Sequence, residues 1–368
     1  MKFTTRALLT IAAGIWGFAP GLPSGPAAAL AGGYDCGDLD ENGMVVASDA
    51  QRLLRFAVGQ PVTIACPAID SSVTDALDAR LDTLEPAVAT LTDKTTCLSR
   101  NGTDTYFTGC NVHVINGSGE TNGLLNGLGN LIIGYNEDQD PPNDRSGIHN
   151  LVIGPDHTFP SYGGLVAGRR NTIAEGNSSV TGGIDNVASG DASSVTGGES
   201  NSATGARASV SGGYSNVASG LDASVTAGEK NEASGQSASV TGGEGNNAKA
   251  FEGSITGGFA NIASETGGTV VGGTGNEASG TDSAVLGGTG NTASGYDSTI
   301  GGGKKNTADN TSASVSGGYG NTASGVASSV SGGSSNDAQG SNSSISGGYQ
   351  HVTLGDLDWK AGGLFQDF

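Results

Sequence analysis

The chain has 368 residues, of which 65 are glycine and only 5% are aromatic, and its formal charge is −20. Such an acidic surface repels nucleic acid and anionic lipid, so neither is expected as a partner. Charged residues make up only 14% of the chain, which is low for a solvated disordered tail.

Residues 1–31 have the features of a secretory signal peptide. Lys2 and Arg6 precede the apolar run ALLTIAAGIWGFA, and an A-x-A cleavage sequence follows at 29–31. The apolar run is short and ends at Pro20, which argues against a membrane anchor. No other segment is apolar enough to span a bilayer. We therefore expect a secreted, extracellular or cell-surface protein without an integral membrane anchor.

Residues 32–68 contain a candidate calcium site in CGDLDENGMVVASD. Oxygen-bearing side chains occupy positions 1, 3, 5 and 12 of a twelve-residue loop, glycine occupies position 6, and position 7 offers its main-chain carbonyl. Alternating oxygens of this kind wrap a hard cation such as Ca²⁺, although an Asx-rich turn without a metal has similar composition. The expected ligands are Asp38, Asp40, Asn42, Met44 and Asp49.

This loop is followed by a predicted helix, and the order of loop then helix resembles a single dockerin repeat. The resemblance implies a calcium-binding module of a kind found in secreted glycan-associated assemblies. It supports an alternative function, in which the protein is an accessory protein that carries this module on a long spacer.

Four cysteines in a secreted chain allow three disulfide pairings. Proximity in the sequence favours Cys36–Cys66 and Cys97–Cys110. The first bond would close the calcium module. The second would clip a β-hairpin that CLSRNGTDTYFTGC predicts around Asn101-Gly102, within an entry region at 96–125.

Residues 69–95 are predicted to be helical. Apolar residues alternate by four and three positions, as in a coiled-coil seam, and Pro86 is expected to interrupt the seam. Both a short neck between chains and an amphipathic helix packed on the rest of the protein fit this pattern. The seam residues are Leu77, Leu81, Leu84, Val88 and Leu91.

Most of residues 126–350 repeats with a period of 15. Each regular repeat has a β-branched residue six positions before an asparagine, a glycine three positions before it and an alanine two positions after it. A flexible linker has no reason to keep this register, because its flexibility depends on composition alone. The repeated asparagines are Asn186, Asn201, Asn216, Asn231, Asn246, Asn261, Asn276, Asn291, Asn306, Asn321 and Asn336.

Each repeat indicates a short strand, a Gly-Gly corner, a second short strand and a further glycine corner. We therefore predict a mainly β fold, a parallel β-solenoid with coils about 4.8 Å apart. The asparagines should stack into a ladder in which each amide bonds to those above and below. Asn310 replaces glycine at the second corner, which predicts a left-handed backbone there.

A single coil has a weak apolar core. One buried valine contributes about 1.5–3 kcal/mol, whereas ordering each residue of the coil costs about 1–2 kcal/mol. We therefore expect the valine column, from Val180 to Val330, to pack against other copies of the chain. A threefold axis would close such an assembly.

The strand pattern begins with GNLIIG, HNLVIG and GGLVAG at 129–168, with 136–144 as an inserted loop. These coils, together with the S-V-x-G-G strands and A-S-G corners of the later repeats, resemble the YadA-like head of trimeric autotransporter adhesins. The resemblance implies a left-handed β-roll, a homotrimer and an adhesin-like role toward an extracellular protein or glycan. The aromatic segment 351–368 is expected to cap the last coil.

No catalytic constellation is recognisable in the sequence. Nucleophile-elbow, H-E-x-x-H and P-loop motifs are absent, and the acidic residues are scattered over variable coil positions. We therefore expect a structural protein and not an enzyme. Its contact points would include the aromatic residues just after the Gly-Gly corner, namely Tyr214, Phe259, Tyr319 and Tyr349.

Overall fold

A computed structural model describes residues 71–94, 96–138 and 142–362, which belong to two units divided after Asn111. The expected calcium loop, the Cys36–Cys66 pair and the signal segment lie outside the described residues.

The first unit contains a helix and a β-hairpin where the sequence predicts them. Helix α3 spans Ser71–Lys94, and strands β1 (Leu98–Asn101) and β2 (Asp104–Phe107) pair antiparallel. Gly102 has a φ of 60°, which the tight turn requires. A disulfide joins Cys97 to Cys110, whose Cα atoms are 5.9 Å apart.

The expected interruption at Pro86 is wrong, because α3 runs through this residue. Proline removes one backbone donor, but its fixed φ is compatible with a helix. The carbonyl of Pro86 also accepts a hydrogen bond of 2.8 Å from the Thr90 hydroxyl. One turn is therefore weakened without ending the helix.

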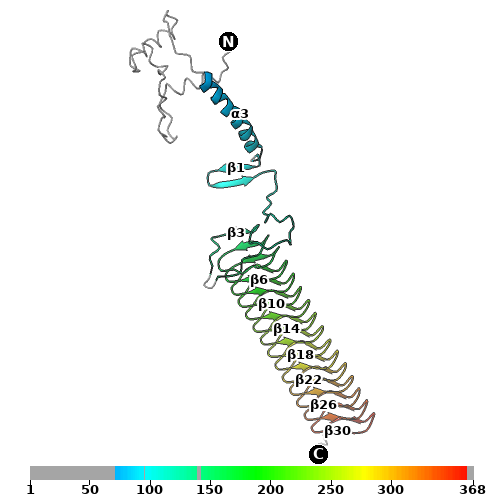
Figure 1. Ribbon diagram of the computed structural model, residues 1–368. Coiled ribbons are helices and arrows are strands. Elements are labelled where there is room, and N and C mark those ends of the chain that lie inside the picture. Colours follow the sequence, from blue (N-terminus) through cyan, green and yellow to red (C-terminus); the bar gives the residue numbers. More distant parts are fainter. Residues whose placement is uncertain (1–70, 95, 139–141, 363–368) are drawn as a thin grey trace, which may run out of the picture. The chain divides into compact units, whose positions relative to one another are not determined.

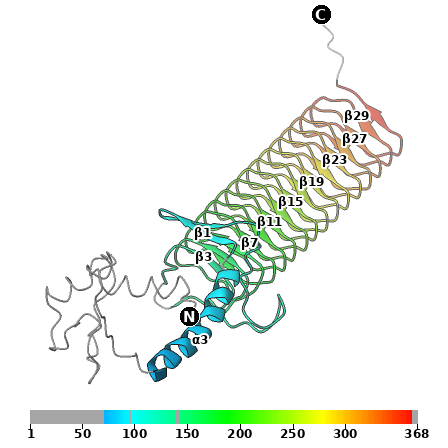
Figure 2. The ribbon, with the colours of Figure 1, turned by 90° about the horizontal axis from the view of Figure 1, so that it is seen from above.

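The second unit is a parallel β-solenoid in which the chain passes alternately through two sheets (Figures 1 and 2). Each strand pairs in parallel with the equivalent strand of the next coil, so that Val210 lies opposite Val225 and Ala218 opposite Ala233. This register confirms the predicted fold class of stacked 15-residue coils.

One sheet has sixteen strands and the other has thirteen. The sixteen-stranded sheet contains β3 (Leu131–Ile133), β4 (Leu151–Ile153), β5 (Leu165–Ala167), β7 (Ser179–Val180), β9 (Ser194–Val195), β11 (Ser209–Val210), β13 (Ser224–Val225), β15 (Ser239–Val240), β17 (Ser254–Ile255), β19 (Thr269–Val270), β21 (Ala284–Val285), β23 (Thr299–Ile300), β25 (Ser314–Val315), β27 (Ser329–Val330), β29 (Ser344–Ile345) and β31 (Trp359–Lys360).

The thirteen-stranded sheet alternates with these strands along the chain. It contains β6 (Thr172–Ile173), β8 (Val187–Ala188), β10 (Ser202–Ala203), β12 (Val217–Ala218), β14 (Glu232–Ala233), β16 (Asn247–Ala248), β18 (Ile262–Ala263), β20 (Glu277–Ala278), β22 (Thr292–Ala293), β24 (Thr307–Ala308), β26 (Thr322–Ala323), β28 (Asp337–Ala338) and β30 (Val352–Thr353). Strands β30 and β31 continue the two sheets, and Trp359 is 67% exposed in the last strand.

The first coil is longer than the others, because Leu131 pairs with Leu151, twenty residues later. The extra residues that the structure describes lie within the expected inserted loop, 136–144. Arg145 holds its described part, since its guanidinium donates to the carbonyls of Asn136 (2.6 Å) and Glu137 and pairs with Asp138 at 3.3 Å.

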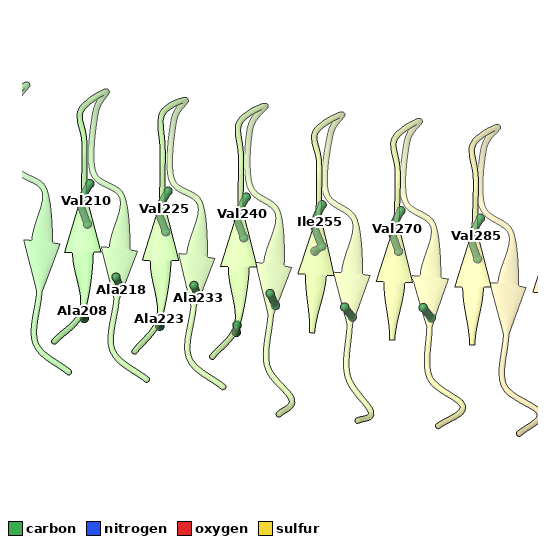
Figure 3. Close-up of a cluster of buried hydrophobic side chains, with 14 of the residues drawn as sticks. Ala208, Val210, Ala218, Ala223, Val225, Ala233, Val240, Ile255, Val270 and Val285 are labelled. Carbon is green, nitrogen blue, oxygen red and sulfur yellow. The ribbon is translucent and has the colours of Figure 1, made fainter. Parts of the chain in front are cut away.

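The core of the regular coils is a column of valine or isoleucine facing a column of alanine, and in some coils a second buried alanine, such as Ala208, is added. Figure 3 shows Val210, Val225 and their equivalents on one sheet, with Ala218 and Ala233 on the other. Both columns are at most 1% exposed from Val180 to Ile345. The expectation that the valines pack against other copies is therefore wrong, because each chain buries them against its own alanines.

The coils are also held together by backbone hydrogen bonds between neighbouring coils. In one coil, the N–H groups of Thr196, Glu199 and Thr204 donate to carbonyls of the next coil at 2.9–3.0 Å. Equivalent bonds recur along the stack. Each added coil therefore brings a set of hydrogen bonds as well as a small apolar core.

The two glycine corners differ in their physical cause. Gly198, in a Gly-Gly corner, has a φ of 87°, and a Cβ there would overlap the carbonyl of Gly213. At the second corner the left-handed prediction for Asn310 is wrong, because Ser312, two residues later, has the positive φ of 54°. Glycine is favoured at that corner for space, since a Cβ on Gly205 would overlap the Gly220 carbonyl.

Adjacent glycines provide a test of the first corner. We expect Gly213→Ala to destabilise the protein by about 1–3 kcal/mol, because its φ of 93° is unfavourable for alanine and the new methyl meets the Gly228 carbonyl. Gly212 has open space and no left-handed φ, so Gly212→Ala should change stability by less than about 0.5 kcal/mol. Urea unfolding measures both, and equal effects would contradict this explanation of the corner.

Candidate functional site

The repeated asparagines form a continuous buried column at the Gly-Gly corner. From Asn171 to Asn336 each is at most 1% exposed. Asn231 is typical. Its Nδ2 donates to the carbonyl of Ala227 at 3.0 Å and to that of Gly243 at 2.9 Å, while its Oδ1 accepts the backbone N–H of Asn246 at 3.0 Å. One side chain thus bonds within its own coil and to the next.

The ladder is therefore built mainly from side chain to backbone. The direct Nδ2 to Oδ1 contacts between neighbouring amides are longer, at 3.1–3.2 Å, and occur at Asn216, Asn246, Asn261 and Asn336. The main role of each amide is to satisfy buried backbone groups, which would otherwise cost about 1–3 kcal/mol each. The column is a structural element, because the hydrogen-bonding groups of its amides are engaged with the backbone inside the fold.

A histidine replaces asparagine at the start of this column. His157 is fully buried, its Nδ1 accepts the N–H of Asn171 at 3.2 Å, and its Nε2 donates to the Ile153 carbonyl at 3.1 Å. These bonds match two of those made by the asparagine amide, namely the donation to the carbonyl four residues earlier and the acceptance of a backbone N–H from the next coil. Burial lowers the pKa of His157. The sequence signal was its position 14 residues before Asn171.

A second histidine takes the equivalent position at the other end. The backbone N–H of His351 donates to Oδ1 of Asn336 at 2.9 Å. His351 thus occupies the place of the next asparagine, as its spacing of 15 residues predicts.

The residues just after each Gly-Gly corner form an outward-facing column, here called the outward corner column. Isolated parallel bridges join each member to the next coil. The column runs Arg169, Ile184, Glu199, Tyr214, Glu229, Glu244, Phe259, Thr274, Thr289, Lys304, Tyr319, Ser334 and Tyr349. Unlike the inward columns, it changes its chemistry from coil to coil.

Aromatic side chains in the outward corner column are exposed and spaced along one line. Tyr214, Phe259, Tyr319 and Tyr349 are between 44% and 64% exposed. They are separated by three, four and two coils, which corresponds to about 14, 19 and 10 Å. Exposed rings on a rigid line can stack on sugar rings or on apolar side chains of a partner.

Ion pairs connect adjacent coils at the left-handed corner positions. The Arg170 guanidinium donates to both carboxylate oxygens of Asp185 at 2.7 Å, which lowers the pKa of Asp185. Arg207 pairs in the same way with Asp222 and lowers the pKa of that carboxyl. These pairs are exposed, so each contributes little to stability, but they reduce local repulsion.

In the described part of the chain, no group of three or more His, Cys, Asp or Glu side chains could hold a metal ion. His149 lines a pocket of about 220 Å³ with Ile115 and Glu120. Both of its ring nitrogens are engaged, because Nε2 accepts the N–H of Asn116 at 3.2 Å and Nδ1 donates to the Thr121 carbonyl at 3.0 Å. Asp38 and the other expected calcium ligands lie outside this part of the chain.

Comparison with known proteins gives no match, either to a protein-family model or to a curated protein. Within the described residues, no helix combines the length and apolar character needed to cross a membrane. The evidence for function is therefore the arrangement of side chains on the solenoid.

The buried amide column can be tested by replacing one side chain with its nearly isosteric acid. In Asn231→Asp the carboxylate would face the carbonyls of Ala227 and Gly243, so we expect a loss of about 3 kcal/mol at neutral pH. The same contacts raise the pKa of the new carboxyl, so the loss should shrink as the pH falls through that pKa. The exposed Asn342→Asp is the control. An equal, pH-independent effect of both substitutions in urea unfolding would contradict this role.

The buried His157 should make the stability of the first coils depend on pH. Its pKa is lower in the folded than in the unfolded chain, so its contribution to stability is complete above the unfolded value near 6.5 and decreases as the pH falls toward the folded value. We expect His157→Asn to flatten the dependence of the urea midpoint between about pH 7.5 and 5. The exposed His113→Asn is the control. An unaltered profile in His157→Asn would show that this imidazole is not the responsible group.

Proposed function

We propose that this protein is a secreted or cell-surface structural protein, adhesin-like in function, whose solenoid presents the outward corner column to an extracellular protein or glycan. The supporting observation is the contrast between columns. Inward positions repeat valine or isoleucine, alanine and asparagine, whereas the outward corner column varies among basic, acidic, aromatic and hydroxyl residues. The fold does not require this variation, so we attribute it to contacts outside the chain.

The proposal includes a homotrimer, as the resemblance to adhesin heads implies. Three copies would present three outward corner columns, and simultaneous contacts would raise the apparent affinity well above that of one column. The helical seam supports association, because Leu77, Leu81 and Leu84 are 60%, 46% and 54% exposed in the single chain. Apolar residues in this pattern are typical of helices that associate with one another.

The alternative function assigns partner binding to the dockerin-like segment, with Ca²⁺ as its cofactor and the solenoid as a spacer. It is supported by the alternating oxygen-bearing residues from Asp38 to Asp49. The two functions differ in which part of the chain contacts the partner and in whether calcium is needed.

Binding to a panel of immobilised extracellular glycans and matrix proteins tests both functions. We expect Tyr214→Ala/Phe259→Ala/Tyr319→Ala to weaken binding at least about tenfold, because exposed aromatic rings carry much of the energy of such contacts. Phe251→Ala/Tyr296→Ala is the matched control, since these rings are 43% and 52% exposed but lie outside the outward corner column. Equal losses in both variants would contradict the proposed site.

The same assay separates the alternative. Binding that survives the three aromatic substitutions, but is lost in Asp38→Ala/Asp40→Ala or after removal of calcium, would assign the partner to the dockerin-like segment.

A further inference from the structure

The outer surface of the sixteen-stranded sheet differs in charge from that of the thirteen-stranded sheet. Each coil contributes two outward positions, one on each side of its buried valine or isoleucine. The twelve coils from β7 to β29 each contribute one residue to each of two columns. The first column runs from Ser179 to Ser344 and is mostly half-buried. The second column runs from Thr181 to Ser346 and is exposed. These two columns are here called the sheet face.

The sheet face carries no charged residue at any of these twenty-four positions, all of which the structure describes. Twenty of them are serine or threonine. The exceptions are small or apolar, namely Val271, Ala284, Leu286 and Gly301.

The charges of the solenoid lie elsewhere. The outer positions of the thirteen-stranded sheet include Glu232, Glu277 and Asp337, and the corners carry the ion pairs and the outward corner column. In a chain with a net charge of −20, copies repel one another unless they meet through a surface that is free of charge. Depletion of charge is also the compositional feature of interface cores.

We propose that the sheet face is the surface through which copies of this chain pack side by side. Its small hydroxyl side chains allow close approach of the backbones. Because every copy has the same spacing between coils, neighbouring copies can match coil for coil along the whole stack, as identical side chains do in stacked sheets. This inference rests on the proposed homotrimer and names the surface that forms it, in place of the buried valine column.

The apolar residues of the sheet face indicate that the copies are parallel. Val271 and Leu286 lie in adjacent coils and are 44% and 52% exposed. The same surface is apolar in the first coils, where Leu131 and Ile133 are 51% and 54% exposed. In a parallel arrangement around an axis, each of these residues meets its own counterparts. An antiparallel arrangement that overlaps along the whole stack would place Val271 and Leu286 against serine and threonine.

A pair of leucines allows a matched test on the full secreted chain. Leu286 lies on the sheet face, whereas Leu221 is 38% exposed at a corner. We expect wild-type protein and Leu221→Lys to be trimers in light scattering and sedimentation. Leu286→Lys should dissociate at a protein concentration at least about tenfold higher than wild type, because like charges would converge at the contact. Circular dichroism of each variant shows whether the solenoid remains folded.

Cross-linking gives a readout that does not depend on stability. Under oxidising conditions Leu286→Cys should form a disulfide-linked dimer within the trimer on a non-reducing gel, and Leu221→Cys should not. If the wild-type chain is monomeric, both the sheet-face contact and the proposed trimer are wrong. If it is trimeric but Leu286→Cys does not cross-link and Leu286→Lys behaves as Leu221→Lys, only the sheet-face contact is overturned.

Discussion

Each regular coil of the solenoid depends on one buried asparagine amide. The Gly-Gly corner and the left-handed residues beside it turn backbone carbonyls toward the interior, where they lack water. The amide of Asn231 bonds to carbonyls of its own coil and of the next one, and its oxygen accepts the N–H of the following asparagine. Without this side chain, the corner would leave unpaired backbone groups in a dry environment, which is strongly unfavourable. A regular period follows, because each amide must lie directly over the preceding one.

This dependence explains how such a thin core is sufficient. One valine and one or two alanines offset only part of the cost of ordering the 15 residues of a coil. The structure closes that core within one chain, with Val210 against the alanines of the facing sheet. Hydrogen bonds between coils, such as that from Thr196 to Val210, add further stabilisation. Stability therefore depends on contacts between neighbouring coils, as in other repeat proteins, and association of copies is not needed to cover the valines.

The period, the two strands of each coil, the hairpin and the Cys97–Cys110 bond could be predicted from the sequence, because each follows from local spacing. The errors have a common cause, which is that one residue type can serve different physical needs. Glycine at the second corner indicated a left-handed backbone, yet it is favoured there for space beside the next coil, and the left-handed residue is Ser312. His157 was missed because its bonds, and not its residue type, match those of asparagine. Whether a column faces inward or outward could not be assigned from composition alone, and the valine column was placed wrongly for that reason.

The inward columns, the sheet face and the outward corner column of the solenoid are under separate physical constraints. Inward positions must keep the size and hydrogen bonding that the stack requires, so they hardly vary. The sheet face keeps uncharged and mostly small residues over twelve coils although solvent would accept charges there, and the outward corner column changes at nearly every coil. Pairs such as Arg170–Asp185 show that a charge at a corner is balanced by the adjacent coil without altering the interior. A residue of the outward corner column can therefore change without disturbing the ladder or the core, which is the property that a surface for recognising varied extracellular partners requires.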